Sequence, residues 1–191
     1  VLSRGLGDVY KRQILMSAYA IFNLKYPSLL CFEQQSQTER SNLKSLFGID
    51  KICSDAQMRR VLDEVCPSTL QSLFAKRYDL LKRTGIQSDY RFLKKYLLFS
   101  VDGVHFFESK KIKCKRCLEK KHRKGACSFH HSMLAAVLVH PDRREVFPVG
   151  CEAIQKQDGL SKNDCELNAS KRLQNKLLEA YEGQSAVMVE D

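Results

Sequence analysis

The chain changes from helical to strand-like periodicity at the stretch Tyr96-Leu-Leu-Phe-Ser-Val-Asp-Gly-Val-His-Phe-Phe107. Aromatic and aliphatic residues occupy both alternating faces of this run, which is typical of a central strand covered on both sides. The run holds one carboxylate, Asp102, and a charged group in an apolar strand costs free energy unless it is paired, protonated or bound to a cation. The stretch therefore predicts a central strand and makes Asp102 a candidate metal ligand, although Asp102-Gly103 is also a common hairpin dipeptide.

The residues after this strand predict three more strands and one helix. These are an apolar run at 129–140, a short strand at 144–149, a helix from about 161 to 182 and a strand at 185–189. Pro148 cannot donate to a ladder, which favours an edge position for its strand. The helix allows the last strand to return parallel to the first and beside it. We therefore expect an α/β (α+β) fold, in which a β-β-β-α-β unit forms a mixed sheet.

Residues 14–90, which precede the sheet, are expected to be helical. Ser54 can cap an amphipathic run at 56–65, and Ser68 can cap a second run that ends near Gly85. Helices joined by a short turn occur in DNA-binding elements and in plain bundles, and no recognition-helix pattern decides between the two. The expected organisation is a helical, potentially DNA-binding region at 14–90, followed by a sheet domain at 91–191.

The first 13 residues resemble the translation of a sequencing-library adaptor, most specifically in the run Asp8-Val-Tyr-Lys-Arg-Gln13. We expect residues 1–13 to be an adaptor-derived artefact and leave them out of the fold. A natural glycine-containing arm is the alternative. The whole chain has a net charge of +10, and without the three basic residues and one acidic residue of this segment the charge is still +8.

Composition and charge exclude several classes of protein. A hydrophobic content of 43% excludes wholesale disorder, and the basic excess favours a polyanionic partner. The longest apolar stretch, 14–31, is interrupted by Asn23, Lys25 and Pro27, so the sequence predicts no membrane span. The eight cysteines follow no disulfide spacing, and the first residues, with their charged groups, are not expected to form a secretory leader. We therefore expect a protein of the reducing cytoplasm.

Several motifs follow Asp102 in a recognisable order. They are Val139-His-Pro-Asp142, Glu152-Ala-Ile-Gln-Lys-Gln-Asp-Gly159, Lys162-Asn-Asp-Cys-Glu-Leu-Asn-Ala169 with Lys171-Arg172, and Val187-Met-Val-Glu-Asp191. With these motifs the chain resembles, over residues 16–191, the DDE transposases of bacterial insertion sequences. The resemblance implies a ribonuclease H-like catalytic domain, of which this chain holds the first half.

The resemblance also implies a reaction and its partners. Asp102 would be the first catalytic carboxylate and Asp191 the second, together binding Mg²⁺ or Mn²⁺ for two-metal phosphodiester hydrolysis and strand transfer at insertion-sequence ends. The third family carboxylate, a Glu on a later helix, has no counterpart here, so we expect an inactive N-terminal fragment that does not cleave transposon-end DNA. The full-length protein would act on double-stranded DNA as a homo-oligomer, associated with the nucleoid of a prokaryotic cytoplasm.

The sequence alone does not fix the roles of four other charged residues. Asp164 and Glu166 could add a metal ligand or complement the positive N-terminal end of the predicted helix. Arg172 could contact a DNA phosphate or pair with a carboxylate, and we favour the pair. Glu190 is expected on the strand face opposite to that of Asp191, and therefore has no assigned role.

A cysteine and histidine cluster, Cys114-x2-Cys117-x4-His122-x4-Cys127, has the spacing of a zinc knuckle. His130 or His131 could supply the fourth ligand in place of Cys127, or no fourth ligand is needed, and a reduced hairpin with incidental thiols is the alternative.

Basic residues surround this cluster and would favour nucleic acid. The expected DNA-binding residues are Lys113, Lys115, Arg116, Lys120, Lys121, Arg123, Lys124 and Arg172. The alternative function is thus a non-enzymatic zinc-knuckle module that binds nucleic acid.

Overall fold

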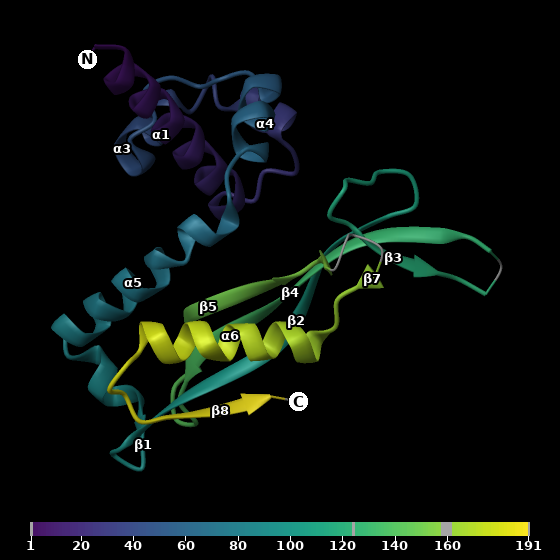
Figure 1. Ribbon diagram of the computed structural model, residues 1–191. Coiled ribbons are helices and arrows are strands. Elements are labelled where there is room, and N and C mark those ends of the chain that lie inside the picture. The colour runs from purple at the N-terminus through teal and green to yellow at the C-terminus, as the bar shows by residue number, and fades with distance from the viewer. Residues whose placement is uncertain (1, 124, 158–161, 191) are drawn as a thin grey trace. The chain divides into compact units, whose positions relative to one another are not determined.

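The computed structural model describes residues 2–123, 125–157 and 162–190. The chain divides into two compact units by its internal contacts, the first covering residues 1–69 and the second residues 70–191. Each unit has its own hydrophobic core. The expected combination of a helical N-terminal part and a mixed sheet is confirmed (Figure 1).

The first unit is helical. Its helices are α1 (Leu2–Asn23), α2 (Leu29–Gln35), α3 (Arg40–Phe47) and α4 (Asp55–Asp63), followed by the 3₁₀ turn η1 (Pro67–Leu70). The predicted cap at Ser54 is confirmed, since its hydroxyl accepts a hydrogen bond from the backbone N–H of Gln57. The core of the unit forms around Ile14, Phe32 and Met58, which are fully buried.

Residues 2–13, which we interpreted as adaptor-derived, continue α1 toward the N-terminus. Tyr10 packs against the core of the first unit, and the Gln13 side chain donates to the carbonyl of Gly48 at 2.9 Å. The Gln13 side-chain oxygen also accepts from the backbone N–H of Asp50 at 2.7 Å. The end of this segment is thus tied to the turn that follows α3.

The second unit joins a six-stranded sheet to helices. Its elements are α5 (Ser72–Arg83), the 3₁₀ turn η2 (Ile86–Tyr90), β1 (Arg91–Phe92), β2 (Tyr96–Ser109), β3 (Leu118–Lys121), β4 (Cys127–Val139), β5 (Phe147–Ile154), β6 (Lys156–Gln157), β7 (Lys162–Asn163), α6 (Glu166–Ala180) and β8 (Ala186–Glu190). From the sequence we expected α5 and η2 to belong to the N-terminal region, but in the structure they belong to the same compact unit as the sheet. Their buried residues Tyr78, Leu81 and Tyr90 belong to the same core as the strands.

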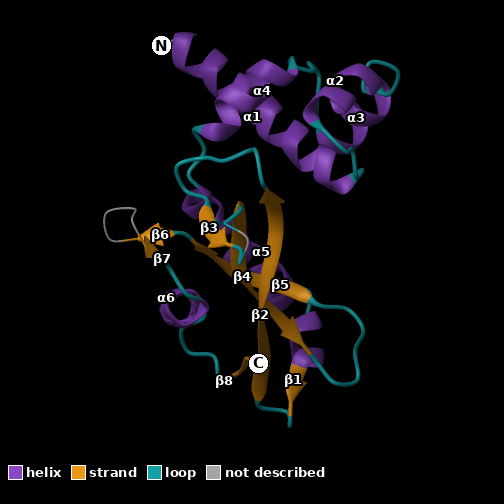
Figure 2. Cartoon of the chain, turned by 90° about the vertical axis from the view of Figure 1, so that its right-hand side faces the viewer, coloured by secondary structure: helices purple, strands orange, loops and turns teal. Residues whose placement is uncertain are grey.

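The long strand β2 lies at the centre of the sheet. It pairs antiparallel with β4 along most of its length and parallel with β8 on its other side, while β5 pairs antiparallel with β4. The strands β5, β4, β2 and β8 thus lie side by side in that order, as the ribbons show (Figures 1 and 2). The predicted β-β-β-α-β order and the parallel return of the last strand are confirmed. Pro148 lies on β5, whose described pairing partner is β4 alone, so its edge position is confirmed too.

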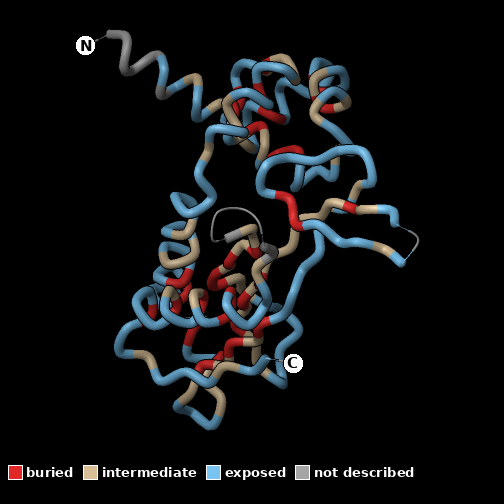
Figure 3. Tube along the Cα trace, turned by 45° about the vertical axis from the view of Figure 1, so that its right-hand side comes forward, coloured by how far each residue is buried: buried red, intermediate tan, exposed pale blue. Residues whose placement is uncertain are grey.

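Helix α6 covers one face of this sheet. Its buried residues Leu173 and Leu177 pack toward β5, where a Cβ on Gly150 would lie 3.0 Å from Leu177 Cδ2. Glycine at this position therefore permits the close approach of helix and strand. Alternate residues of β2, from Leu97 to Val101, are buried in the core beneath the helix, which explains the apolar residues on that face of the strand. Figure 3 shows the buried residues of the chain in red.

Candidate functional site

Asp102 lies inside β2 rather than in a turn. It pairs with Ala135 of β4, and the preceding Val101 pairs in parallel with Glu190 of β8. The hairpin interpretation of Asp102-Gly103 is therefore wrong, because the strand continues through both residues to Ser109. Asp191, the second expected catalytic carboxylate, lies outside the described residues.

Two carboxylates, those of Glu166 and Glu190, line one small pocket beside Asp102. The pocket has a volume of about 100 Å³ and is lined by Val101, Asp102, Gly103, Leu134, Glu166 and Glu190. The side chains of Glu166 and Glu190 reach it from the first turn of α6 and from the end of β8, whereas the Asp102 side chain points to the opposite face of the sheet, because successive residues of a strand alternate. Gly103 makes room for the Glu166 carboxylate, since a Cβ at this position would lie 2.9 Å from Glu166 Oε1. The β-β-β-α-β order thus brings Glu166 and Glu190, which follow Asp102 by 64 and 88 positions, beside this strand.

Glu190 is the residue of this pocket to which the sequence analysis gave no role. Its carboxylate accepts a hydrogen bond of 2.7 Å from the hydroxyl of Ser170, a buried residue of α6. Residues paired in parallel strands point to the same side of the sheet, so Glu190 shares the face of its partner Val101 and is directed toward α6. The register of the parallel pair, which a single sequence does not specify, was the missing signal.

The pocket suits a hard cation by its donor chemistry. Carboxylate oxygens are preferred by Mg²⁺ and Mn²⁺, and the described residues that line the pocket include no Lys or Arg to neutralise them. The carboxylates do not converge, because the only group of three described ligand residues whose donor atoms lie within 4.8 Å of one another is elsewhere. Asp102 Oδ1 instead accepts from the backbone N–H of Gly103 at 2.7 Å. The Asp102 carboxylate shares the face of its ladder partner Ala135, which is opposite to the face of Glu166 and Glu190.

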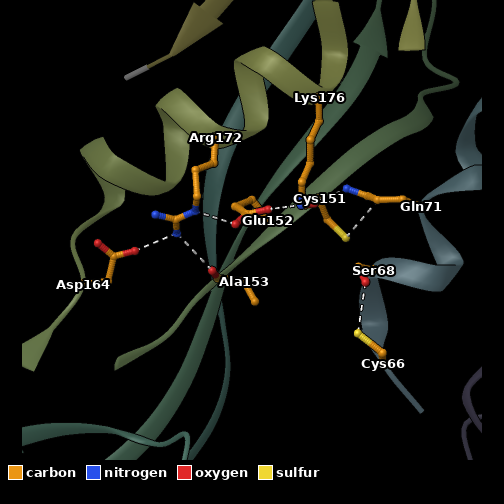
Figure 4. A network of polar contacts seen from close by, with 9 residues as sticks. All are labelled: Cys66, Ser68, Gln71, Cys151, Glu152, Ala153, Asp164, Arg172 and Lys176. Carbon is orange, nitrogen blue, oxygen red and sulfur yellow. Dashed lines mark hydrogen bonds and ion pairs between the residues drawn. The ribbon is translucent and has the colours of Figure 1, made fainter. Parts of the chain in front are cut away.

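Arg172 of α6 forms ion pairs instead of facing solvent. Its Nε lies 2.7 Å from Glu152 Oε1, and its terminal nitrogen lies 2.6 Å from Asp164 Oδ2 (Figure 4). Lys176, one turn further along α6, also pairs with Glu152. The paired interpretation of Arg172 is therefore confirmed.

Asp164 belongs to this network and is not among the residues that line the carboxylate pocket. Its side chain is only 2% exposed. Burial alone would raise the pKa of this carboxyl, but hydrogen bonds from Arg172, Asn168 and the backbone of Cys165 outweigh burial and lower it. Asp164 is thus held as a carboxylate that joins the start of α6 to Arg172.

A second candidate site lies where the 110–117 loop meets β4. Cys114 Sγ and Cys117 Sγ are 3.6 Å apart, and each lies 3.3 Å from His131 Nε2. Cys117 is buried, Cys114 is exposed and His131 is half-buried. Burial lowers the pKa of His131, which favours the neutral imidazole, and raises the pKa of the Cys117 thiol.

The other two expected zinc ligands make different contacts. His122 Nε2 forms a hydrogen bond of 2.8 Å with the hydroxyl of Ser128, and the Cys127 thiol is directed to the backbone carbonyl of the same serine. The structure therefore brings together two of the four residues of the expected knuckle and adds His131. His131 was named in the sequence analysis only as a substitute ligand.

The basic side chains around this cluster are largely free to meet a partner. Exposed residues are Lys113, Lys115, Arg116, Lys120, Lys121 and Arg123. Lys113 Nζ also lies 5.2 Å from the centre of the Phe129 ring, over β4. Lys124 lies outside the described residues, and Arg172 is committed to its two carboxylates.

No family model, curated protein or solved structure matches this chain. Within the described part of the chain, every helix is too short or too polar to cross a bilayer.

Proposed function

We propose that the chain is part of a DDE transposase and contributes Asp102 to metal-dependent hydrolysis and transfer of DNA phosphodiesters. One observation carries the proposal: the central strand β2 presents Asp102 just past its parallel pairing with the end of β8. The connection through α6 gives the β-β-β-α-β order that the resemblance to these transposases implies. A ribonuclease H-like architecture is part of the same proposal.

The residues of the pocket have separate roles in this scheme. Asp102 would hold the cation, together with Asp191 by the resemblance. Ser170 orients Glu190 through its hydrogen bond, and Gly103 leaves the space that Glu166 occupies. The cation would polarise the scissile phosphate and lower the pKa of the attacking water or 3′-hydroxyl.

Mn²⁺ binding to the purified chain tests the metal centre. Isothermal titration should detect a site that Asp102→Asn abolishes, because an amide supplies no charge to the cation. The matched control is Asp142→Asn in the turn after β4, since the Asp142 side chain is 89% exposed and lies outside the pocket. Equal Mn²⁺ affinity in the wild type and the Asp102→Asn variant would refute the proposed centre.

Duplex DNA tests the substrate class. Mn²⁺ should strengthen binding of a DNA duplex to the wild type and not to the Asp102→Asn variant, because a cation shared between protein and phosphate is lost in the variant. Metal-independent affinity that is identical in both proteins would instead support the alternative function, a nucleic-acid-binding module without catalysis. The exposed basic side chains beside the Cys114 and Cys117 thiols favour this second candidate.

A further inference from the structure

We propose that Cys114, Cys117 and His131 bind one Zn²⁺, with an exchangeable water as the fourth ligand. This site is distinct from the carboxylate pocket and does not depend on the transposase proposal. It differs from the zinc knuckle expected from sequence spacing, because the third ligand comes from the interior of β4 and not from the β3–β4 hairpin.

The positions of the donor atoms fit a tetrahedral zinc ion. Ideal Zn–S and Zn–N lengths place two thiolates about 3.8 Å apart and a thiolate about 3.6 Å from an imidazole nitrogen. The corresponding separations here are 3.6 Å between the sulfurs and 3.3 Å from each sulfur to His131 Nε2. Insertion of the ion therefore requires shifts of only about 0.3 Å.

The backbone of the loop supports two thiolates at this place. The N–H of Cys114 donates to Cys117 Sγ at 3.2 Å, and the N–H of Arg116 donates to Cys114 Sγ at 3.4 Å. Such bonds stabilise negative charge on sulfur and fix both sulfurs in one Cys-x2-Cys turn. Two thiolates and a neutral imidazole also cancel the charge of Zn²⁺, so the nearby lysines and arginines do not oppose metal binding.

The third ligand is held by the sheet. His131 lies within β4, where it pairs with Phe107 of β2. The centre of its ring lies 5.9 Å from the ring centre of Phe106 and 5.7 Å from that of Phe107. The ion would therefore fasten the loop between β2 and β3 to the central strand pair. Thiolate and imidazole ligands select Zn²⁺ over Mg²⁺, which separates this site from the carboxylate pocket.

The fourth coordination position follows from the same group. Among the described His, Cys, Asp and Glu residues, no fourth donor atom joins these three within 4.8 Å. Three protein ligands and one solvent ligand give an open site. The ion should therefore accept an exogenous ligand, which a site closed by four protein ligands does not.

Metal analysis of the purified chain tests the proposal directly. We expect one zinc per chain in the wild type and background zinc in His131→Ala and Cys114→Ser. His122→Ala and Cys127→Ser are the matched controls and should keep one zinc per chain, because these two side chains form hydrogen bonds with Ser128 and do not face the proposed zinc site. Asp102→Asn should also keep its zinc, so failure of this site is distinguishable from failure of the carboxylate centre.

Cobalt substitution reports the ligand set without relying on the stability of a variant. The Co²⁺ form of the wild type should show the intense visible bands of a tetrahedral ion and a sulfur charge-transfer band, and added imidazole should shift the visible bands. Loss of zinc in His122→Ala and Cys127→Ser with retention in His131→Ala would overturn the assignment. Substoichiometric zinc in the wild type, or a Co²⁺ spectrum without sulfur charge transfer, would overturn it as well.

Discussion

Glu166 at the start of α6 lies directly against Gly103 of β2, so that a Cβ at Gly103 would approach Glu166 Oε1 to 2.9 Å. This contact connects the helix to the residue that follows Asp102. Any larger side chain at Gly103 would displace the Glu166 carboxylate from this end of the pocket. Replacement of this glycine therefore tests the geometry of the carboxylates without removing any of them.

Gly103→Ala should leave the fold and Mn²⁺ binding at Asp102 nearly unchanged, because Glu166 lies on the face of the sheet opposite to the Asp102 side chain. The added methyl meets the far end of a flexible side chain, so Glu166 can rotate away with a loss of less than about 1 kcal/mol in the free energy of unfolding. Its oxygen then leaves the pocket. Urea denaturation and Mn²⁺ titration of the same preparation measure the two effects.

Gly150→Ala is the matched glycine control and should destabilise the fold. Here the new methyl would lie 3.0 Å from Leu177 Cδ2 and 3.4 Å from Leu173 Cδ1, both in the buried core. Overpacking of this kind lowers the free energy of unfolding by about 1–3 kcal/mol, with Mn²⁺ affinity retained. A loss of Mn²⁺ affinity in Gly103→Ala would contradict the separation of Glu166 from the cation at Asp102.

Arg172→Met should destabilise the second unit by about 3 kcal/mol at neutral pH, because it leaves the nearly buried Asp164 carboxylate without its cation. The lowered pKa of Asp164 means that the folded state binds this proton less readily than the unfolded chain. The ion pair of Asp164 with Arg172 therefore contributes its full stabilisation at pH values above 3.8, the ordinary pKa of an aspartate. This stabilisation is lost as the pH falls through the lowered pKa of Asp164 in the folded state. The difference between variant and wild type should shrink below about pH 4.

Chemical denaturation across that pH range measures the effect. Lys171→Met is the control on the same helix, since Lys171 is exposed. It should change the free energy of unfolding by less than about 0.5 kcal/mol at every pH. A pH-independent penalty for Arg172→Met would show that lost packing, and not the ion pair, is the cause.

Tyr181→Phe should reveal the hydrogen bond that ties the end of α6 to β5. The Tyr181 hydroxyl donates to the backbone carbonyl of Val149 at 2.7 Å in the buried core, and burial raises the pKa of the phenol. The variant leaves this carbonyl without a donor and should lose about 1–3 kcal/mol in urea denaturation. Tyr96→Phe at the partly exposed start of β2 is the control, and an equal loss there would argue against a specific role of this bond.

The basic residues of the β3–β4 hairpin should contribute to nucleic-acid affinity through counterion release. Replacement of Lys120, Lys121 and Arg123 with Gln should reduce the slope of log K against log salt for a DNA duplex by up to about 2.7. The control removes the same number of exposed charges from α5, with Arg77, Lys82 and Arg83 changed to Gln. If only the α5 variant reduced the slope of log K against log salt, the DNA-contacting surface would lie on α5 and not on the hairpin.

The strand order was predictable because each segment carries its own signal. The apolar run around Phe99 predicts a central strand, Pro148 predicts an edge, and the amphipathic helix before the last strand requires a crossover. These signals are local in the sequence, and the structure confirms them. The sequence could not decide whether Asp102 lies within the strand or in a hairpin turn, because the dipeptide Asp102-Gly103 is compatible with both positions.

The composition of both sites depends on register, which is not local. Glu190 joins the carboxylate pocket because it pairs with Val101 across a parallel ladder. His131 of β4, and not His122 of the turn between β3 and β4, meets the cysteines, because the strand pairing sets which histidine faces the loop. Spacing along the chain predicts which types of residue are candidate ligands. Long-range strand pairing decides which individual residues of each type come together.

The pairing of β4 with β2 also sets a distance between two chemistries. His131 and Ala135 lie on β4, and Ala135 is the pairing partner of Asp102. Four residues of strand correspond to about 14 Å, well beyond the Debye length of about 8 Å at physiological salt. A thiolate-bound ion and a carboxylate-bound ion would thus be thermodynamically unlinked, and the dissociation constant of each should stay the same whether the other is loaded or stripped.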